Sequence, residues 1–212
     1  MAVTAAALIV GAWMAWFIAG AFYGASVALW VALFELIDPV GRRWWQGSDG
    51  EAATSGQLRR CRRQGWRVVH NLMLEAGDID HIAVGPGGVV AIETKSTDAD
   101  WEWLSRQSIH RGWTRQASSS AARARALVRQ HAGLAVQVRP VVAAWVRGLA
   151  DVGPVECNGV RIVHGSTLAD LLGDLDPVLT GEQVDQIHQA LEPVARRLDV
   201  HWASRSAAAA RV

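Results

Sequence analysis

Two carboxylates and a lysine lie close together in residues 78–96, at a spacing that suits metal-dependent chemistry. This stretch predicts two strands, 79–84 and 89–95, because both runs are rich in Ile and Val and alternate at a period of two. A Gly-Pro-Gly-Gly turn joins them. If the turn is symmetric about its central Pro-Gly pair, Asp80 faces Glu93 across the hairpin. Strand side chains alternate sides, so both carboxylates then share one face with apolar pairs.

Opposed carboxylates at the end of an apolar face repel each other, since directly opposed Cβ atoms lie about 5 Å apart. A divalent cation with oxygen ligands would offset this repulsion. Lys95 points to the same face, and it is the only lysine in a chain whose lysines and arginines together number 21. The alternative is an exposed, salt-bridged hairpin end. The apolar face and the single lysine favour a functional site.

The amino-terminal segment has no charged residue before Glu35. This run exceeds the ~20 apolar residues that a membrane-spanning helix needs, and it lacks the positive leader and cleavage site of a secretory signal. Residues 1–38 are therefore predicted to form a transmembrane segment. It is either one long tilted helix or two short helices that turn near the G-x-x-x-G motif at 20–24, which is also a candidate helix-packing face.

Arg42 and Arg43, which two tryptophans follow, mark a membrane–water interface with its cytoplasmic side here. Residues 39–49 are predicted to be a juxtamembrane linker, and the rest of the chain a cytoplasmic domain attached to the cell membrane. Cys61 and Cys157 have no C-x-x-C partner, as expected for unpaired core cysteines in a reducing compartment.

The first helix of the globular part is predicted over 51–64, with Asp49 as its cap. Glu51 lies on the inward stripe of this helix, although a glutamate so early in a helix can simply favour the helix dipole. A basic cluster follows near its end. Its side chains could contact phosphate, lie against anionic lipid or simply form a solvated face. Its members are Arg59, Arg60, Arg62 and Arg63.

The remaining elements alternate between strands and helices, which predicts an α/β domain with a mixed sheet over residues 50–202. The ambiguous, tryptophan-rich stretch 98–107 is interpreted as a fourth strand, with Trp101 and Trp103 on one side. Residues 203–212 are predicted to be a disordered tail. The other expected strands are 66–74, 136–146 and 160–163, and the other expected helices are 113–131, 168–172 and 181–198.

Other chemistry finds little support. The chain has no phosphate-binding glycine loop of the P-loop or dinucleotide type and no G-x-S-x-G elbow. Residues 118–120 are serines inside a helix without an adjacent base. His81 neighbours Asp80 but points to the opposite face, which favours a structural role. The net charge of +1 means that any nucleic-acid-binding surface must be local.

The order of these motifs resembles the nuclease-related domain (NERD) family. The resemblance runs from Gly47 and Glu51, through I-D-H-I-x-V-G-P-G-G-V-x-x-I-E-T-K at 79–95, to W-x-x-Q at 113–116. NERD domains are similar to PD-(D/E)xK nucleases, so the resemblance implies a restriction-endonuclease-like mixed β-sheet flanked by helices. The residue before Asp80 is isoleucine where the superfamily name has proline.

The resemblance also implies roles for individual residues. Asp80 and Glu93 correspond to the metal ligands, which the backbone carbonyl of Thr94 completes, for Mg²⁺ or Mn²⁺. Lys95 corresponds to the lysine that contacts the attacking water or the scissile phosphate. Two further residues match family positions, namely the first-helix acidic residue Glu51 and the helix glutamine Gln116.

The expected function is Mg²⁺-dependent hydrolysis of nucleic-acid phosphodiesters by a membrane-anchored protein, with DNA favoured as substrate. The expected partners are nucleic acid and the lipid bilayer, and a homodimer is compatible with the sequence. No organic cofactor is expected. One alternative is a membrane-tethered module that binds nucleic acid or acts as a scaffold without turnover. In another, the acidic hairpin is only a structural cation site.

Overall fold

The computed structural model describes residues 2–37, 39–75 and 77–209 of the 212-residue chain. It divides between residues 45 and 46 into two compact units. The second unit holds the mixed sheet and its helices, and it contains every candidate site residue.

The first unit consists mainly of α1 (Ala2–Ile37), one continuous helix. Of the two predicted arrangements, the structure has the single long helix, and Gly20 and Gly24 lie within it. Over Trp13–Leu33 the helix is long and apolar enough to cross a membrane, and none of this stretch is buried. By length and composition α1 is a candidate membrane span or signal sequence.

The helix α2 (Pro39–Arg60) is longer than predicted and is followed by the 3-10 turn η1 (Cys61–Gln64). Residues 39–49, predicted to be a juxtamembrane linker, are part of this helix. Pro39 suits the first helical position, where no intrahelical N–H bond is lost. Gly50 does not break the helix: it lets α2 approach β3, since a Cβ at this position would lie 2.7 Å from Ser96 Cβ.

Six strands form one mixed sheet in the order β1-β2-β3-β4-β6-β5. The first three strands are antiparallel neighbours, β4 pairs in parallel with both β3 and β6, and β5 is antiparallel to β6. Parallel pairing of β3 with β4 requires a crossover, which α3 and α4 provide. The strands are β1 (Arg67–Leu72), β2 (Ile79–Gly85), β3 (Gly88–Asp100), β4 (Val138–Arg147), β5 (Val155–Cys157) and β6 (Val160–His164).

The register of the β2–β3 hairpin is the predicted one. Val84 pairs with Val89 and Ile82 with Ala91, so the turn is symmetric about Pro86 and Gly87. All four of these apolar residues are buried in one core cluster. Extending the same register two residues further places Asp80 opposite Glu93.

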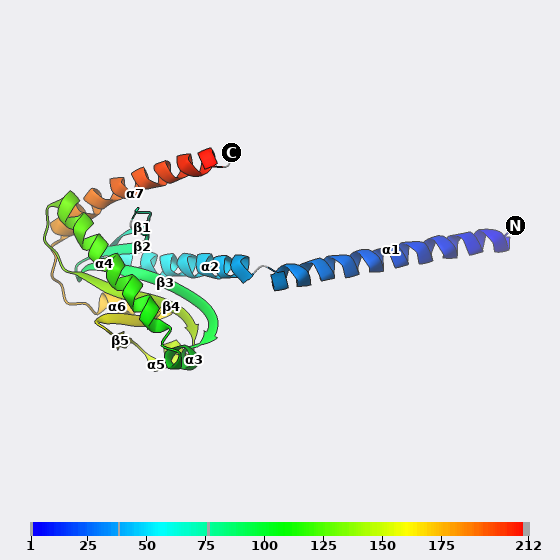
Figure 1. The fold of residues 1–212 in the computed structure, drawn as a ribbon, viewed down its shortest axis with the longest axis horizontal. Coiled ribbons are helices and arrows are strands. Elements are labelled where there is room, and N and C mark those ends of the chain that lie inside the picture. Colours follow the sequence, from blue (N-terminus) through cyan, green and yellow to red (C-terminus); the bar gives the residue numbers. More distant parts are fainter. Residues whose placement is uncertain (1, 38, 76, 210–212) are drawn as a thin grey trace. The chain divides into compact units, whose positions relative to one another are not determined.

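The face that carries these pairs is covered by α4 (His110–Ala132) and α7 (Gly181–Ala209), and Figure 1 shows α4 lying across the sheet. The other face packs on α2, η1 and α6 (Leu168–Gly173). A third cluster, which includes Trp101 and Leu149, fills the space near α3 (Trp101–Arg106) and α5 (Leu149–Val152). A 3-10 turn, η2 (Gly165–Thr167), precedes α6.

One expectation was wrong. The fourth strand predicted over 98–107 is instead the end of β3 followed by α3, so Trp101 is buried while Trp103 is 53% exposed. Asp100 starts the helix by accepting a hydrogen bond from the backbone N–H of Glu102 at 2.9 Å. The predicted disordered tail at 203–212 is helical through Ala209, and its last three residues lie outside the described ones.

Candidate active site

The two carboxylates lie where the β2–β3 ladder ends. Strand pairing of β2 with β3 is recorded up to His81 and Ile92. At the next residue of β2, a side chain takes the place of a backbone acceptor: Oδ2 of Asp80 accepts a hydrogen bond from the backbone N–H of Thr94 at 2.7 Å. The N–H and C=O of one strand residue point to the same side of the strand, so the Thr94 carbonyl also faces the Asp80 side.

Glu93 is 1% exposed, and each of its carboxylate oxygens has a partner. Lys95 Nζ donates to Oε1 at 2.9 Å, and the hydroxyl of the buried Ser120 donates to Oε2 at 3.3 Å. Ser120 comes from α4, so this helix fixes the orientation of a carboxylate on β3. Charged hydrogen bonds of this kind are stronger than neutral ones and hold a side chain in one geometry.

The pKa values of both carboxyls are raised. Burial is the main cause for Asp80 and for Glu93, and the Asp80 carboxylate raises the pKa of Glu93 further. The Lys95 ammonium acts in the opposite direction on both groups. The two carboxyls therefore form an interacting pair whose ionisation is disfavoured mainly by burial.

Glu51 approaches this pair from α2. Burial raises its pKa first, the nearby Asp80 carboxylate raises it further, and Lys95 lowers it. Glu51 therefore lies within electrostatic reach of Asp80 and Lys95. The side chain is half-buried, so it faces the rim of the site rather than the core.

A buried hydroxyl ties α2 to the sheet. Thr54 Oγ1 donates to the carbonyl of Gly50 at 2.9 Å and accepts from Thr94 Oγ1 at 3.2 Å and from Trp145 Nε1 at 2.9 Å. One hydroxyl donor and two lone pairs are thus all used. This arrangement joins α2, β3 and β4 one turn after Glu51.

Replacing Thr54 with valine should destabilise the second unit by about 1–3 kcal/mol, since it leaves the Trp145 indole N–H and the Thr94 hydroxyl without their partner. Valine has nearly the same shape, so the loss reports the hydrogen bonds rather than packing. Urea unfolding followed by tryptophan fluorescence measures it. Thr54→Ser is the control and should retain most of the stability; equal losses in both variants would contradict the hydrogen-bond explanation.

Gln116 and His81, which were also considered from the sequence, form no hydrogen bond with the two carboxylates. Gln116 is exposed on α4, and no described residue forms a hydrogen bond with its side chain. His81 is buried, and its Nδ1 lies 2.9 Å from Nδ1 of His70. Burial, with a smaller contribution from His70, lowers the pKa of His81 to about 3. His81 is therefore neutral near pH 7, which fits the structural role expected from its orientation.

Sequence reasoning missed three contributors to the site: Ser120, Arg123 and Thr54. Arg123 Nη2 donates to Ser120 Oγ at 3.0 Å and to the carbonyl of Asp78 at 2.9 Å, so it connects α4 to the start of β2. Helical spacing could have identified Ser120, because it follows Gln116 by four residues and therefore lies on the same side of α4. Thr54 follows Glu51 by three residues in the same way.

The donor set fits a hard divalent cation. Mg²⁺ usually keeps several waters and binds one or two carboxylates, and Asp80, Glu93 and the Thr94 carbonyl supply oxygen ligands of this kind. Among the described residues, no three His, Cys, Asp or Glu side chains gather closely enough to form a metal cluster of their own. Two carboxylates would leave most of the coordination of such an ion to water.

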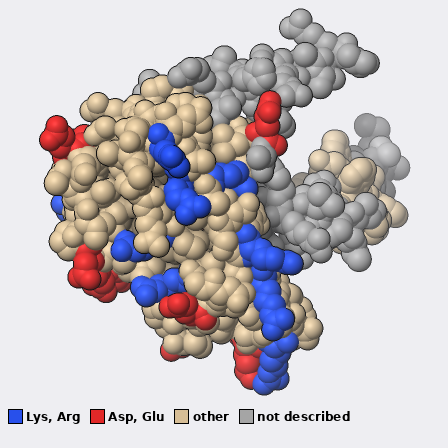
Figure 2. All heavy atoms as spheres, turned by 60° about the vertical axis from the view of Figure 1, so that its left-hand side comes forward, with Lys and Arg blue, Asp and Glu red and all other residues tan. Residues whose placement is uncertain are grey.

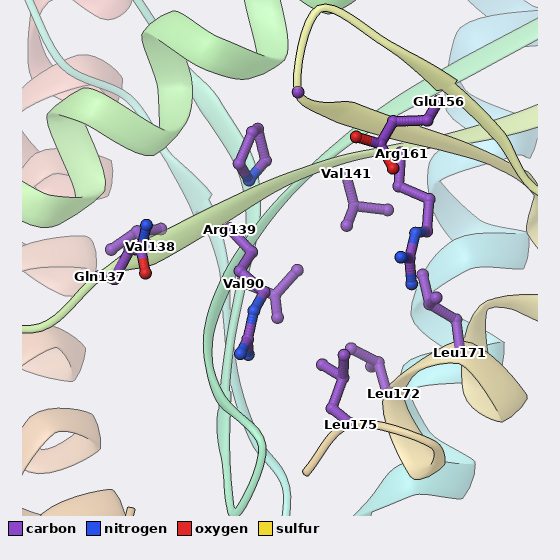
Figure 3. Close-up of a pocket in the computed structure, with 12 residues that line it drawn as sticks. Val90, Gln137, Val138, Arg139, Val141, Glu156, Arg161, Leu171, Leu172 and Leu175 are labelled. Atoms are coloured by element: carbon purple, nitrogen blue, oxygen red, sulfur yellow. The ribbon is translucent and has the colours of Figure 1, made fainter. Parts of the chain in front are cut away.

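A separate cavity of about 250 Å³ lies between the start of β4 and α6. Figure 3 shows Arg139 and Arg161 on either side of a floor that includes Val90 and Val141. Val90 lies on the face of β3 opposite to Glu93, because strand side chains alternate. None of the candidate site residues lines this cavity.

Comparison with known families agrees with the motif. Residues 46–145 match the family model described as the nuclease-related domain, NERD. This confirms the predicted resemblance over the part of the chain that contains Glu51, Asp80, Glu93 and Lys95. No curated protein matches the chain.

Proposed function

Since residues 46–145 carry a nuclease-related domain, we propose that this chain hydrolyses phosphodiester bonds of nucleic acid, preferably DNA, with Mg²⁺ or Mn²⁺. The observation that carries the proposal is the pairing of Asp80 with the buried Glu93, whose carboxylate binds Lys95 at 2.9 Å. Carboxylates and one lysine at the open end of a hairpin are the parts that phosphodiester hydrolysis requires. The restriction-endonuclease-like character of the fold belongs to the same proposal.

Each residue has a defined task. Asp80, Glu93 and the Thr94 carbonyl would hold the cation, which supplies charge stabilisation and makes a bound water easier to deprotonate. Lys95 orients the attacking water and stabilises negative charge as it develops on the scissile phosphate. Thr94 N–H and Ser120 Oγ keep the two carboxylates in place. Glu51 and Gln116 flank the approach to the site from α2 and α4.

The full-length chain, purified in detergent and incubated with plasmid and labelled oligonucleotides, tests this function. Cleavage is expected with Mg²⁺ or Mn²⁺ and should stop with EDTA. Glu93→Gln under the same purification controls for contaminating nucleases. Salt-sensitive binding without cleavage of any DNA or RNA would instead support the membrane-tethered binding module, and metal-dependent melting without either activity would support a structural cation site.

We also propose that α1 anchors the chain in the cell membrane with the second unit in the cytoplasm. The uncharged run before Glu35 and the Arg42–Arg43 pair support this orientation. The full chain should sediment with membranes and resist washing with high salt and with carbonate, whereas a chain lacking residues 1–38 should be released. Protease access to the second unit only from outside intact cells would reverse the orientation, and a soluble full-length chain would disprove the anchor.

A further inference from the structure

The helix α4 carries five arginines and no acidic residue in its 23 residues. At 3.6 residues per turn, four of the arginines fall within an arc of roughly 80° on the helix surface. All four are exposed, and they are Arg111, Arg115, Arg125 and Arg129. We call this set the arginine stripe.

Among the described residues, the arginine stripe has no charged partner. No described residue forms a hydrogen bond or ion pair with any of its four guanidinium groups. Arg111 and Arg115 are four residues apart, as are Arg125 and Arg129, and like charges at this spacing destabilise a helix. An anionic partner outside the described part of the chain would remove this cost. Basic side chains also gather in a band along one side of the face in Figure 2.

A groove runs beside the carboxyl-terminal half of the stripe. It has a volume of about 860 Å³ and lies between α4 and the segment that leads into β4. Arg125 and Arg129 lie on its edge with the amides of Gln130 and Gln137. The alanines that line it are Ala122, Ala126 and Ala135, whose small side chains let a ligand approach the backbone closely.

We propose that this groove and the arginine stripe bind the phosphodiester backbone of a nucleic acid. Guanidinium groups and amide N–H donors are the usual protein contacts to phosphate oxygens. From Arg111 to Arg129 the stripe extends about 27 Å along the helix, at ~1.5 Å per residue, which is long enough for several consecutive phosphates. A flat bilayer surface would contact exposed arginines but would not need a groove, so the groove favours a nucleic-acid strand over lipid headgroups.

The stripe is distinct from the carboxylate pair. Ser120, which contacts Glu93, projects from α4 at 180° from Arg111 and Arg129 on the helical wheel, at about 100° per residue. A strand in the groove is therefore not in position for hydrolysis by the same carboxylates. The stripe instead holds a second segment of the nucleic acid and keeps it at the domain between cleavage events. This inference rests on nucleic acid being the substrate class of the proposed function.

The test measures binding without cleavage. The full chain with Glu93→Gln, in detergent and EDTA, is titrated with a fluorescent 20-base-pair duplex or single strand of DNA or RNA over a salt series. The stripe variant adds R111Q, R115Q, R125Q and R129Q, and the matched control adds R59Q, R60Q, R62Q and R63Q on α2 and η1. Glutamine keeps a good helix former at each position. Neither variant should melt at a lower temperature than the parent protein, since removal of like-charge repulsion can only stabilise the helix.

For duplex DNA, the stripe variant should bind at least tenfold more weakly. Its slope of log K against log salt should fall by up to about 3.6, or ~0.9 for each phosphate that an arginine no longer neutralises. The control should change binding less.

If the stripe variant binds like the parent, or if only the control variant binds more weakly, the inference is wrong. If the stripe variant binds phosphatidylserine vesicles more weakly but nucleic acid equally well, the partner is lipid and the inference is likewise wrong. Absence of cleavage by the wild-type chain, with stripe-dependent binding intact, would instead overturn only the proposed hydrolysis.

Discussion

Cleavage by Lys95→Ala should be at least 10²-fold slower than cleavage by the wild-type chain, while metal binding persists. Lys95 supplies the one lysine ammonium of the chain, 2.9 Å from Glu93 Oε1. Removal of one group that stabilises transition-state charge typically costs 10²–10³ in the rate constant. Because the lysine lowers the pKa of Glu93, its removal should also raise that pKa further and shift the rate profile toward higher pH.

Single-turnover cleavage at saturating Mg²⁺ measures the effect on rate, and the metal-induced increase in melting temperature reports binding separately. Metal should still stabilise Lys95→Ala, and more strongly if loss of the neighbouring positive charge dominates. Lys95→Arg keeps the charge but not the compact geometry of the ammonium, so it should fall between alanine and wild type. An unchanged single-turnover rate in Lys95→Ala would show that the assigned role is wrong.

Asp80→Asn and Glu93→Gln should each abolish metal-dependent stabilisation while leaving the metal-free chain as stable as wild type or slightly more so. At a metal concentration 100 times its Kd, the wild-type chain should gain about 2.7 kcal/mol, and this linkage disappears with a ligand. The amides can still accept the hydrogen bonds now made to Asp80 Oδ2 and to Glu93 Oε1, from Thr94 N–H and Lys95. Both amides remove the repulsion and the burial of charge. Glu93→Gln also replaces the acceptor that faces Ser120 with an amide donor and removes the ion pair with Lys95, which limits the expected gain.

The stability of the metal-free chain should change with pH in a defined direction. Burial raises the pKa of Glu93 above its ordinary value of 4.5, so the folded state favours the protonated form. The resulting stability is fully present below pH 4.5 and is lost as the pH rises through the folded-state pKa. Glu93→Gln should remove this loss, and its metal-free stability should therefore vary less between about pH 4.5 and 8 than that of wild type.

Thermal melting with and without Mg²⁺, repeated across this pH range, measures both effects. Asp78→Asn is the matched control, because Asp78 is an exposed carboxylate two residues before Asp80. Arg123 donates to the backbone carbonyl of Asp78, so the substitution leaves this hydrogen bond in place. It should retain the metal-induced shift. A Glu93→Gln chain that Mg²⁺ still stabilises like wild type would rule out Glu93 as a ligand.

Local pattern was sufficient for the hairpin. A Gly-Pro-Gly-Gly turn that is symmetric about its central Pro-Gly pair sets one register, and the structure has that register, with the apolar residues of 82–84 and 89–92 buried on both faces of the sheet. A slip of one residue would turn each side chain to the other face. The positions of Asp80, Glu93 and Lys95 relative to one another follow from this register alone.

Local pattern failed where packing overrode it. The Gly-Ser-Asp-Gly sequence at 47–50 is typical of a break between elements, yet α2 continues through it, and Gly50 is needed for close approach to Ser96. The alternation of Trp101 and Trp103 suggested a strand, but burial of Trp101 with Leu104 in one cluster fits the three-residue spacing of a helix. In both stretches a distant element decided the conformation.

The sequence by itself determined the membrane-length apolar helix, the mixed α/β class, the hairpin and the chemical identity of its acidic and basic groups, because these depend on periodicity and composition within short segments. Only the tertiary structure decided which distant residues complete the site. Ser120 reaches Glu93 from 27 positions away in the sequence, and Trp145 reaches Thr54 from 91 positions away. Such pairs depend on how α2 and α4 cross the sheet, and that crossing is set by the packing of whole faces, which no short segment encodes.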